Sequence, residues 1–152
     1  MQTRAKKSFG QHFLKDEQIA HRIASSLSLD DSYDHIVEVG PGKGMLTQFL
    51  TGMGKDLTLI EADQDMVAYL HKHLPEVSEH IVQEDFLKVA LDRVVDAPSF
   101  ALIGNFPYNI SSQIVFHMIR YRELIPEMVG MFQKEMAQRI VAEPGTKAYG
   151  VI

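Results

Sequence analysis

The segment Asn105-Phe106-Pro107-Tyr108 combines groups that suit chemistry on an amino nitrogen. An adenine amino group is a poor nucleophile because its lone pair is delocalised into the ring. The Asn105 amide oxygen and the Pro107 carbonyl oxygen could accept its two N–H bonds and aim a more tetrahedral nitrogen at a methyl donor. Tyr108 could stack on a flipped base. The segment predicts adenine N6 methylation, with Asn105, Pro107 and Tyr108 as catalytic residues and no general base.

An Asn-x-Pro turn with a buried tyrosine would explain the same four residues without any chemistry. The methylation reading therefore requires a methyl donor beside Asn105, and the donor needs its own site. The sequence upstream of Asn105 supplies three elements of such a site.

The first element is a glycine-rich turn that follows an apolar run, Val37-Glu-Val-Gly-Pro-Gly-Lys-Gly44. Glycines let the backbone pass close to a ligand and present amide groups at a helix start, where the dipole favours an anionic group such as a carboxylate. A nicotinamide fingerprint is Gly-x-Gly-x-x-Gly, whereas here the glycines stand at 40, 42 and 44. The spacing favours a ligand with an amino-acid tail over a pyrophosphate, with Gly40 as a contact.

Two acids complete the predicted cofactor site. Glu61 stands 21 residues after Gly40, at the end of the next apolar run, a spacing that suits a carboxylate accepting from two ribose hydroxyls. Asp85 follows the third run and could accept from an exocyclic amine, while Phe86 packs on a purine face. An acidic cap at Asp85 with Phe86 in the core is the plainer alternative. Position favours the ligand, because ligands of doubly wound sheets bind outside the carboxyl ends of strands.

The elements that position these residues follow an α/β pattern of apolar runs alternating with helical segments, which predicts a parallel sheet. The five runs are His35 to Val39, Leu57 to Glu61, His80 to Gln83, Phe100 to Gly104 and Met128 to Phe132.

Helix starts are expected at Asp16, Asp63, Ser111 or Ser112, and Gln133. Their expected buried stripes hold Ile19, Ile23 and Leu27; Met66, Val67 and Leu70; Ile114, Val115, Met118 and Ile119; and Met136 and Ile140.

The 152 residues, with 45% hydrophobic and 23% charged composition, can bury one sizeable core. The absence of cysteine excludes disulfides and thiol chemistry, and the seven histidines show no metal spacing, so no metal site is expected. The first 15 residues hold four basic and no acidic side chains, although the net charge is -5. With no signal or membrane-spanning segment, a cytoplasmic protein is expected.

Four segments together resemble the rRNA adenine dimethyltransferase family, closest to members that act on small-subunit (16S) rRNA. They are Lys7-Ser-Phe-Gly-Gln-His-Phe-Leu14, Val37 to Gly44, Asn105-Phe-Pro-Tyr-Asn-Ile-Ser111 and Gln133-Lys-Glu-Met-Ala-Gln-Arg139. The resemblance implies a Rossmann-like class I fold with a mostly parallel sheet. It also implies S-adenosyl-L-methionine as the cofactor, contacted by His12, Leu14, Gly40, Glu61, Asp85 and Asn105. Histidine stands at position 12, where the family often has asparagine. Phenylalanine stands at position 106, where relatives often have leucine.

The resemblance further implies methylation of two adjacent adenines in the 3′-terminal hairpin of small-subunit rRNA during ribosome biogenesis, by a protein that is monomeric at full length. We expect residues 1–152 to be an incomplete catalytic domain, truncated after about five strands, without the last strands and the C-terminal helical RNA-binding domain. Such a piece should methylate RNA poorly.

Three other functions stay open at this point. They are a large-subunit rRNA adenine methyltransferase, which is usually more basic than this pI of about 5.8, a ribosome-assembly factor that does not depend on catalysis, and a small-molecule methyltransferase.

Overall fold

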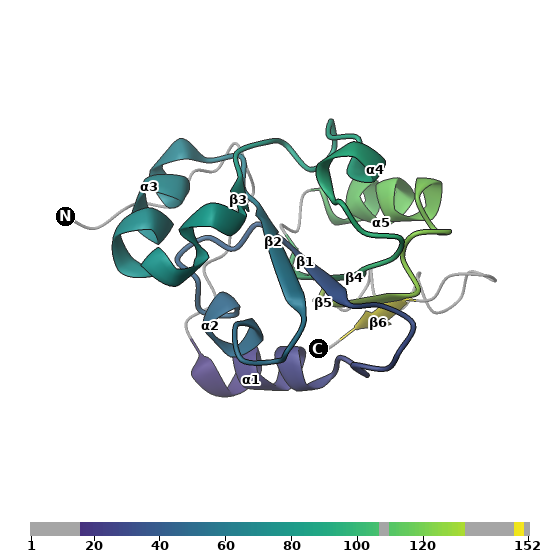
Figure 1. The fold of residues 1–152 in the computed structure, drawn as a ribbon, viewed down its shortest axis with the longest axis horizontal. Helices are drawn as coiled ribbons and strands as arrows, with labels where there is room; N and C mark the ends of the chain where they lie inside the picture. Colours follow the sequence, from purple (N-terminus) through teal and green to yellow (C-terminus); the bar gives the residue numbers. More distant parts are fainter. Residues whose placement is uncertain (1–15, 107–109, 133–147, 151–152) are drawn as a thin grey trace.

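The computed structural model describes residues 16–106, 110–132 and 148–150, and these contain one sheet in the order β3-β2-β1-β4-β5-β6 (Figure 1). Every neighbouring pair is parallel. The strands are β1 (His35–Val39), β2 (Asp56–Ile60), β3 (Ile81–Val82), β4 (Ala101–Asn105), β5 (Glu127–Met131) and β6 (Ala148–Gly150). The strand order reverses between β1 and β4, the position at which doubly wound sheets bind ligands.

The five predicted strands are all present and the parallel sheet is confirmed. All their bounds agree within one residue, and β3 is one residue shorter at each end than its apolar run. The expectation of about five strands is exceeded by β6, whose Tyr149 pairs with Val129 of β5. Within the described residues, β5 therefore has a neighbour on both sides. The sequence shows the start of a further apolar run at Tyr149-Gly150-Val151-Ile152, but it was not counted among the five expected strands.

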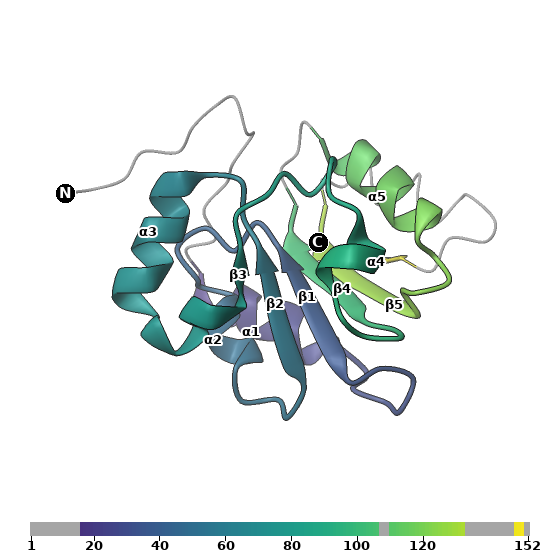
Figure 2. The same cartoon turned by 45° about the horizontal axis from the view of Figure 1, so that its top comes forward.

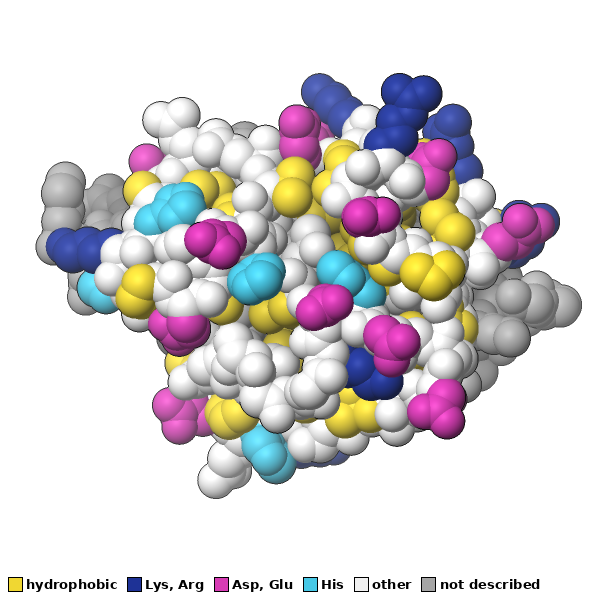
Figure 3. Space-filling view, viewed as in Figure 1, with side chains coloured by type: hydrophobic (Ala, Val, Ile, Leu, Met, Phe, Trp, Pro, Cys, Tyr) yellow, Lys and Arg dark blue, Asp and Glu magenta, His cyan; other side chains and the backbone are white. Residues whose placement is uncertain are grey.

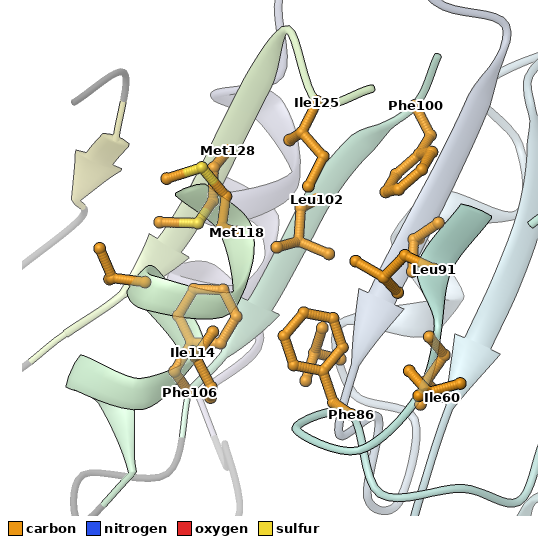
Figure 4. Close-up of a cluster of buried hydrophobic side chains, with 14 of the residues drawn as sticks. Ile60, Phe86, Leu91, Phe100, Leu102, Phe106, Ile114, Met118, Ile125 and Met128 are labelled. Atoms are coloured by element: carbon orange, nitrogen blue, oxygen red, sulfur yellow. The ribbon is translucent and has the colours of Figure 1, made fainter. Parts of the chain in front are cut away.

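Helices cover both faces of the sheet (Figure 2). They are α1 (Glu17–Ser25), α2 (Thr47–Leu50), α3 (Gln64–His73), α4 (Leu91–Val94) and α5 (Ser111–Arg120), with the 3-10 helix η2 (Pro75–His80) after α3. One core contains the buried side chains of α4 and α5, and it is shown in Figure 4. A second core contains those of α1, α2 and η2.

The strands serve both cores because their side chains alternate between the two faces. Leu102 and Met128 belong to the core with α5, whereas Ile103 and Val129 belong to the core with α1. Burial on both faces explains why these strands read as continuous apolar runs.

Local caps fix two helix starts as predicted. The Asp16 carboxylate accepts from the backbone N–H of Gln18 at 2.8 Å and begins α1. The Asp63 carboxylate accepts from the N–H of Asp65 at 2.8 Å and begins α3. Helix α5 begins at Ser111, as one of the two predicted starts, but its cap residue is Ile110 and makes no side-chain cap bond. Of these, the Asp63 cap places the start of α3 shortly after the end of β2, where the site lies.

Helix α1 ends earlier than its predicted stripe. Leu27 lies two residues beyond Ser25 and is nonetheless buried in the core with Ile23. The turn after α1 is held by Glu127 at the start of β5, which accepts from the N–H of Ser28 at 3.0 Å and from the hydroxyl of Tyr33 at 2.7 Å. These hydrogen bonds join the segment between α1 and β1 to the start of β5, 94 to 99 residues later in the chain.

None of the helices in the described ranges combines the length and apolar character needed to cross a membrane. The helix predicted from Gln133, with Met136 and Ile140, lies outside the described residues.

Candidate active site

A cavity of about 560 Å³ lies at the carboxyl ends of β1, β2, β3 and β4. Its walls include four of the predicted site residues, Gly40, Glu61, Asp85 and Asn105. They come from four different strand ends, so only the folded sheet brings them together. The other four, His12, Leu14, Pro107 and Tyr108, lie outside the described residues.

The glycine turn forms the floor of the cavity between β1 and α2. Gly40 has a φ of 66° and Gly42 a φ of 57°, in the left-handed region that favours glycine. A Cβ atom at Gly40 would meet no heavy atom within 4 Å, and because Gly40 lines the cavity, that atom would project into it. The bare backbone at this point leaves room for a ligand to lie against it.

Glu61 is held in a fixed orientation at the end of β2. Its Oε1 accepts from the N–H of Gly42 at 2.9 Å and its Oε2 from the N–H of Asp63 at 3.0 Å. Only 3% of the residue is exposed, and burial raises the pKa of its carboxyl, while the two backbone donors oppose that rise. Each oxygen has a second lone pair, so the carboxylate can accept two more hydrogen bonds.

Glu38 lies beneath the same turn, inside β1. Its Oε1 accepts from the hydroxyl of Thr47 in α2 at 2.5 Å. Burial, with the residue only 2% exposed, and to a lesser extent the nearby Glu61 carboxylate raise the pKa of Glu38 to about 8, although the hydrogen bond from Thr47 opposes the rise. Glu38 is therefore largely protonated at neutral pH and joins the strand to the helix that follows the glycine turn.

Asp85 both caps a local turn and lines the cavity, the two alternatives that its sequence context offered. Its Oδ1 accepts from the N–H of Leu87 at 3.0 Å, which is the local cap, and Phe86 is buried in the core. Asp85 nevertheless lines the cavity together with Phe86. A carboxylate that caps a turn with one oxygen can still meet a ligand with the other.

The turn that carries Phe86 is fastened to α5 by a buried histidine. The Nε2 of His117 lies 3.1 Å from the carbonyl oxygen of Val89, and its ring meets that of Phe86 edge-on, with centroids 4.9 Å apart. Burial lowers the pKa of His117, which favours the neutral ring. Its role is to hold the Phe86 turn against the helix that follows Asn105.

Asn105 ends β4 beside β1, and its partner in the register with β5 is Met131. The next residue, Phe106, is buried in the core and contacts the ring of Phe132, with centroids 5.0 Å apart. Phe106 fills an apolar slot, as its sequence position suggested, and anchors the backbone on one side of the predicted catalytic segment.

One wall of the cavity was not predicted. It consists of Lys43, Tyr69 and His73. The rings of Tyr69 and His73 stack with centroids 4.2 Å apart, and the Lys43 ammonium lies 5.7 Å from the centre of the Tyr69 ring. Their spacing of four residues puts both rings on one side of α3. Nothing in the sequence of α3 itself indicates that this side faces the glycine turn.

The charged lining of the cavity is mainly acidic. Five carboxylic residues contribute to it, against the single basic residue Lys43. The acids are Glu17, Glu38, Glu61, Glu84 and Asp85. Even with Glu38 protonated, acids outnumber bases, which disfavours a pyrophosphate and suits a ligand with positive charge. In the described part of the chain no group of three or more His, Cys, Asp or Glu side chains could hold a metal ion.

The model of the ribosomal RNA adenine dimethylase family matches residues 2–152. The chain belongs to the ribosomal RNA adenine dimethylase family. The expected resemblance is thus confirmed over nearly the whole chain. Gly40, Glu61, Asp85 and Asn105 stand together in this structure at the strand ends where the dimethylase resemblance expected cofactor contacts.

A curated relative supports the family assignment. The chain is 50% identical over 149 residues to the "Ribosomal RNA small subunit methyltransferase A" of Flavobacterium johnsoniae. The match covers 98% of this chain and 57% of that relative, so this chain spans little more than half of the relative's length.

Two solved structures share the fold of this dimethylase chain. A dimethyladenosine transferase from Plasmodium falciparum has a TM-score of 0.70 at 32% identity, covering 87% of this chain and 47% of that one. The 23S rRNA methyltransferase ErmE has a TM-score of 0.69 at 28% identity, covering 88% and 53%. The Rossmann-like fold of class I S-adenosylmethionine-dependent methyltransferases is confirmed.

Proposed function

We propose that residues 1–152 form the cofactor-binding catalytic domain of an adenine-N6 dimethyltransferase that uses S-adenosyl-L-methionine. The proposed substrate is a pair of adjacent adenines in the 3′-terminal hairpin of small-subunit (16S) rRNA. The protein would act in the cytoplasm on the immature small ribosomal subunit, as a monomer at full length. The observation that carries this proposal is the acidic cavity that joins Gly40, Glu61, Asp85 and Asn105.

The cavity fits this cofactor in charge and in hydrogen bonding. S-adenosyl-L-methionine carries a sulfonium and an ammonium against one carboxylate, so a predominantly acidic lining suits it better than it suits a nucleotide. The open lone pairs of Glu61 could accept from the ribose hydroxyls, and Asp85 beside Phe86 could receive the adenine end. The bare Gly40 backbone fits the methionine end, where His12 and Leu14 are proposed to contribute.

When bound, the cofactor supplies an electrophilic methyl group. The residues of the chain have to orient the acceptor. Asn105 and the carbonyl of Pro107 would accept the N–H bonds of the target adenine and direct its lone pair toward the methyl group, while Tyr108 stacks on the base. Rate enhancement would come from this orientation and from charge, because the nitrogen releases its proton readily once it is alkylated.

A large-subunit substrate is the second candidate, because the ErmE structure matches this chain almost as well as the Plasmodium falciparum enzyme does. Sequence identity favours the small subunit, with 50% to the Flavobacterium johnsoniae small-subunit enzyme and 28% to ErmE.

Radiolabelled S-adenosylmethionine tests the proposal directly. The protein, in this chain and in a full-length version, is incubated with undermethylated small subunits, large subunits and DNA, and the label is then located. We expect label on two neighbouring adenines of small-subunit rRNA, with slower labelling by the 152-residue chain. Label confined to DNA or to large-subunit RNA would overturn the substrate, and failure of either version to bind the cofactor would overturn the site.

A further inference from the structure

Helix α5 carries an exposed aromatic side chain that the active site leaves unexplained. Phe116 is 66% exposed and is the one large hydrophobic residue exposed in the described ranges. Its helix neighbours Ile114, Val115 and Met118 are buried and hold α5 on the sheet. Packing of the domain therefore does not require an aromatic ring at position 116.

The outer face of α5 is a stripe that ends in a positive charge. Gln113, Phe116 and Arg120 follow each other at spacings of three and four residues, so they share one helix face, and all three are exposed. The helix contains no acidic residue. A single exposed phenylalanine is common on protein surfaces, so the charge around it has to decide whether it has a function.

Basic residues concentrate around α4 and α5. Four of the eight in the described ranges lie there, exposed, and Figure 3 shows Lys and Arg side chains gathered over these helices at the upper right. They are Lys88, Arg93, Arg120 and Arg122. The acids in the same two segments, 86–96 and 110–123, number three. Elsewhere the described residues hold four basic and 15 acidic side chains, so a polyanion would meet the least repulsion here.

No salt bridge joins any of these four side chains to another residue that the structure describes. The Arg122 guanidinium donates to the carbonyl oxygen of Ile119 at 3.2 Å, and that of Arg120 lies 5.9 Å from the ring centre of Tyr121. Neither partner is anionic, so these contacts do not neutralise the positive charges of Arg120 and Arg122.

The helix that carries this surface also borders the cavity. Helix α5 starts six residues after Asn105, and its first turn contributes to the cavity wall through Ile110 and Ile114. Phe116 stands two positions after Ile114, on the opposite side of the helix. A strand of nucleic acid that placed one base in the cavity could pass its neighbouring nucleotides over this face.

We propose that the outer face of α5, with Phe116 and Arg120, together with the basic side chains of Lys88, Arg93 and Arg122 on the neighbouring segments, binds single-stranded RNA that flanks the target adenine. An unpaired base stacks on the Phe116 ring, and the basic side chains contact the phosphates. This inference rests on the proposed function and adds to it a second contact point for the same substrate.

The chemistry of this surface matches single-stranded better than paired RNA. A base must be unstacked to offer its face to an aromatic side chain, which loops allow and duplexes do not. Arginine and lysine bind phosphates in either form, so they give affinity without this preference. The Phe116 ring is therefore the reason that we expect this surface to prefer unpaired over paired RNA.

Fluorescence anisotropy with two labelled RNAs tests the proposal on the full 152-residue chain. One RNA is a hairpin with an unpaired loop, and the other is a blunt duplex of equal length. We expect Phe116→Ala to weaken hairpin binding about 5- to 100-fold and duplex binding much less. Phe116→Trp keeps an aromatic ring and should bind the hairpin about as tightly as wild type. Arg120→Gln should weaken both and lower the salt slope by about one. The matched control Arg22→Gln, on α1 across the sheet, should change little.

Hairpin affinity of Phe116→Ala within twofold of wild type would overturn the inference, as would equal losses on both RNAs. Sedimentation of the same samples tests whether a second copy of the chain, rather than RNA, binds the exposed Phe116 side chain. If wild type is a dimer that Phe116→Ala dissociates without loss of RNA binding, the surface serves self-association. Cofactor binding measured on the same samples distinguishes failure of this inference from failure of the proposed function. If the protein binds S-adenosylmethionine and RNA and Phe116→Ala leaves RNA binding unchanged, only the inference about Phe116 is wrong.

Discussion

The ring of Phe106 lies against Gly130 on the neighbouring strand β5, in the space that any larger residue would need for its side chain. Gly104 on β4 is crowded in the same way, by the ring and by the carbonyl oxygen of Val39. The two glycines form a slot for the ring next to Asn105. The position of the predicted catalytic segment thus depends on residues that touch no substrate.

Gly130→Ala should destabilise the protein by about 1–3 kcal/mol, because the added methyl group overlaps the Phe106 ring. The double variant Gly130→Ala/Phe106→Leu should recover part of this loss, since leucine lacks the ring atoms that the added methyl group meets, whereas the carbonyl oxygen of Gly104 stays 2.9 Å from that group. Urea unfolding measures both. Gly52→Ala is the control, because a Cβ there meets nothing within 4 Å. Additive losses in the double variant would show that the slot does not couple the two positions.

Glu61→Ala should weaken cofactor binding by about 100-fold or more, as two charge-assisted hydrogen bonds are lost. Glu61→Gln should also weaken it, because one side-chain oxygen becomes an NH2 group facing a backbone N–H of Gly42 or Asp63. Calorimetric titration with S-adenosylhomocysteine gives the dissociation constants. Glu79→Ala, an exposed acid on η2, should bind like wild type. Equal affinity of all three variants would exclude Glu61 from the ribose site.

Asn105→Ala should lower the rate of methyl transfer by about 100- to 1000-fold, because one of the acceptors that orients the amino group is missing. Its effect on cofactor affinity should be smaller than that of Glu61→Ala. Single-turnover reactions on undermethylated small subunits, at saturating cofactor, separate the two effects. Wild-type turnover in this variant would remove the amide from the mechanism.

Glu38 should give the stability of the cofactor-free protein a distinct pH dependence. Its pKa is raised from 4.5 to about 8 in the folded chain, so below pH 4.5 both states are protonated and the contribution is complete. Between these values the unfolded chain releases a proton that the folded chain keeps. The Glu38 contribution therefore falls with rising pH, by at most about 1.4 kcal/mol per pH unit.

Glu38→Gln replaces the titrating carboxyl group by an amide and keeps an oxygen that can accept from the hydroxyl of Thr47. We expect the variant to gain stability relative to wild type as the pH rises from 5 to 8, measured by urea unfolding at each pH. Glu79→Gln serves as the exposed control and should follow wild type. Parallel curves for wild type and Glu38→Gln would show that Glu38 titrates normally.

The sequence predicted features that depend on local chemistry. Asp16 and Asp63 are caps because their carboxylates reach backbone groups two residues away. The strands were found because burial on both faces leaves an apolar run. Gly40, Glu61 and Asp85 were predicted from their place after such runs.

Features that depend on contacts across the fold were not predictable in the same way. The wall of Lys43, Tyr69 and His73 exists because the glycine turn faces α3, which no spacing within one segment reveals. The fastening of the Phe86 turn by His117 joins positions 31 residues apart. Strand β6 follows 15 residues outside the described ranges and is identified by its pairing with β5.

The described walls of the cavity have a further consequence for the order of events during synthesis. They all fall between Glu17 and Ile114, whereas β5, with Glu127, and β6 come later in the chain. Domains fold from the N-terminus as they emerge from the ribosome. The growing polypeptide therefore carries every described cofactor-facing group before β5 and β6 exist, and ligand binding to a nascent chain would favour completion of the sheet.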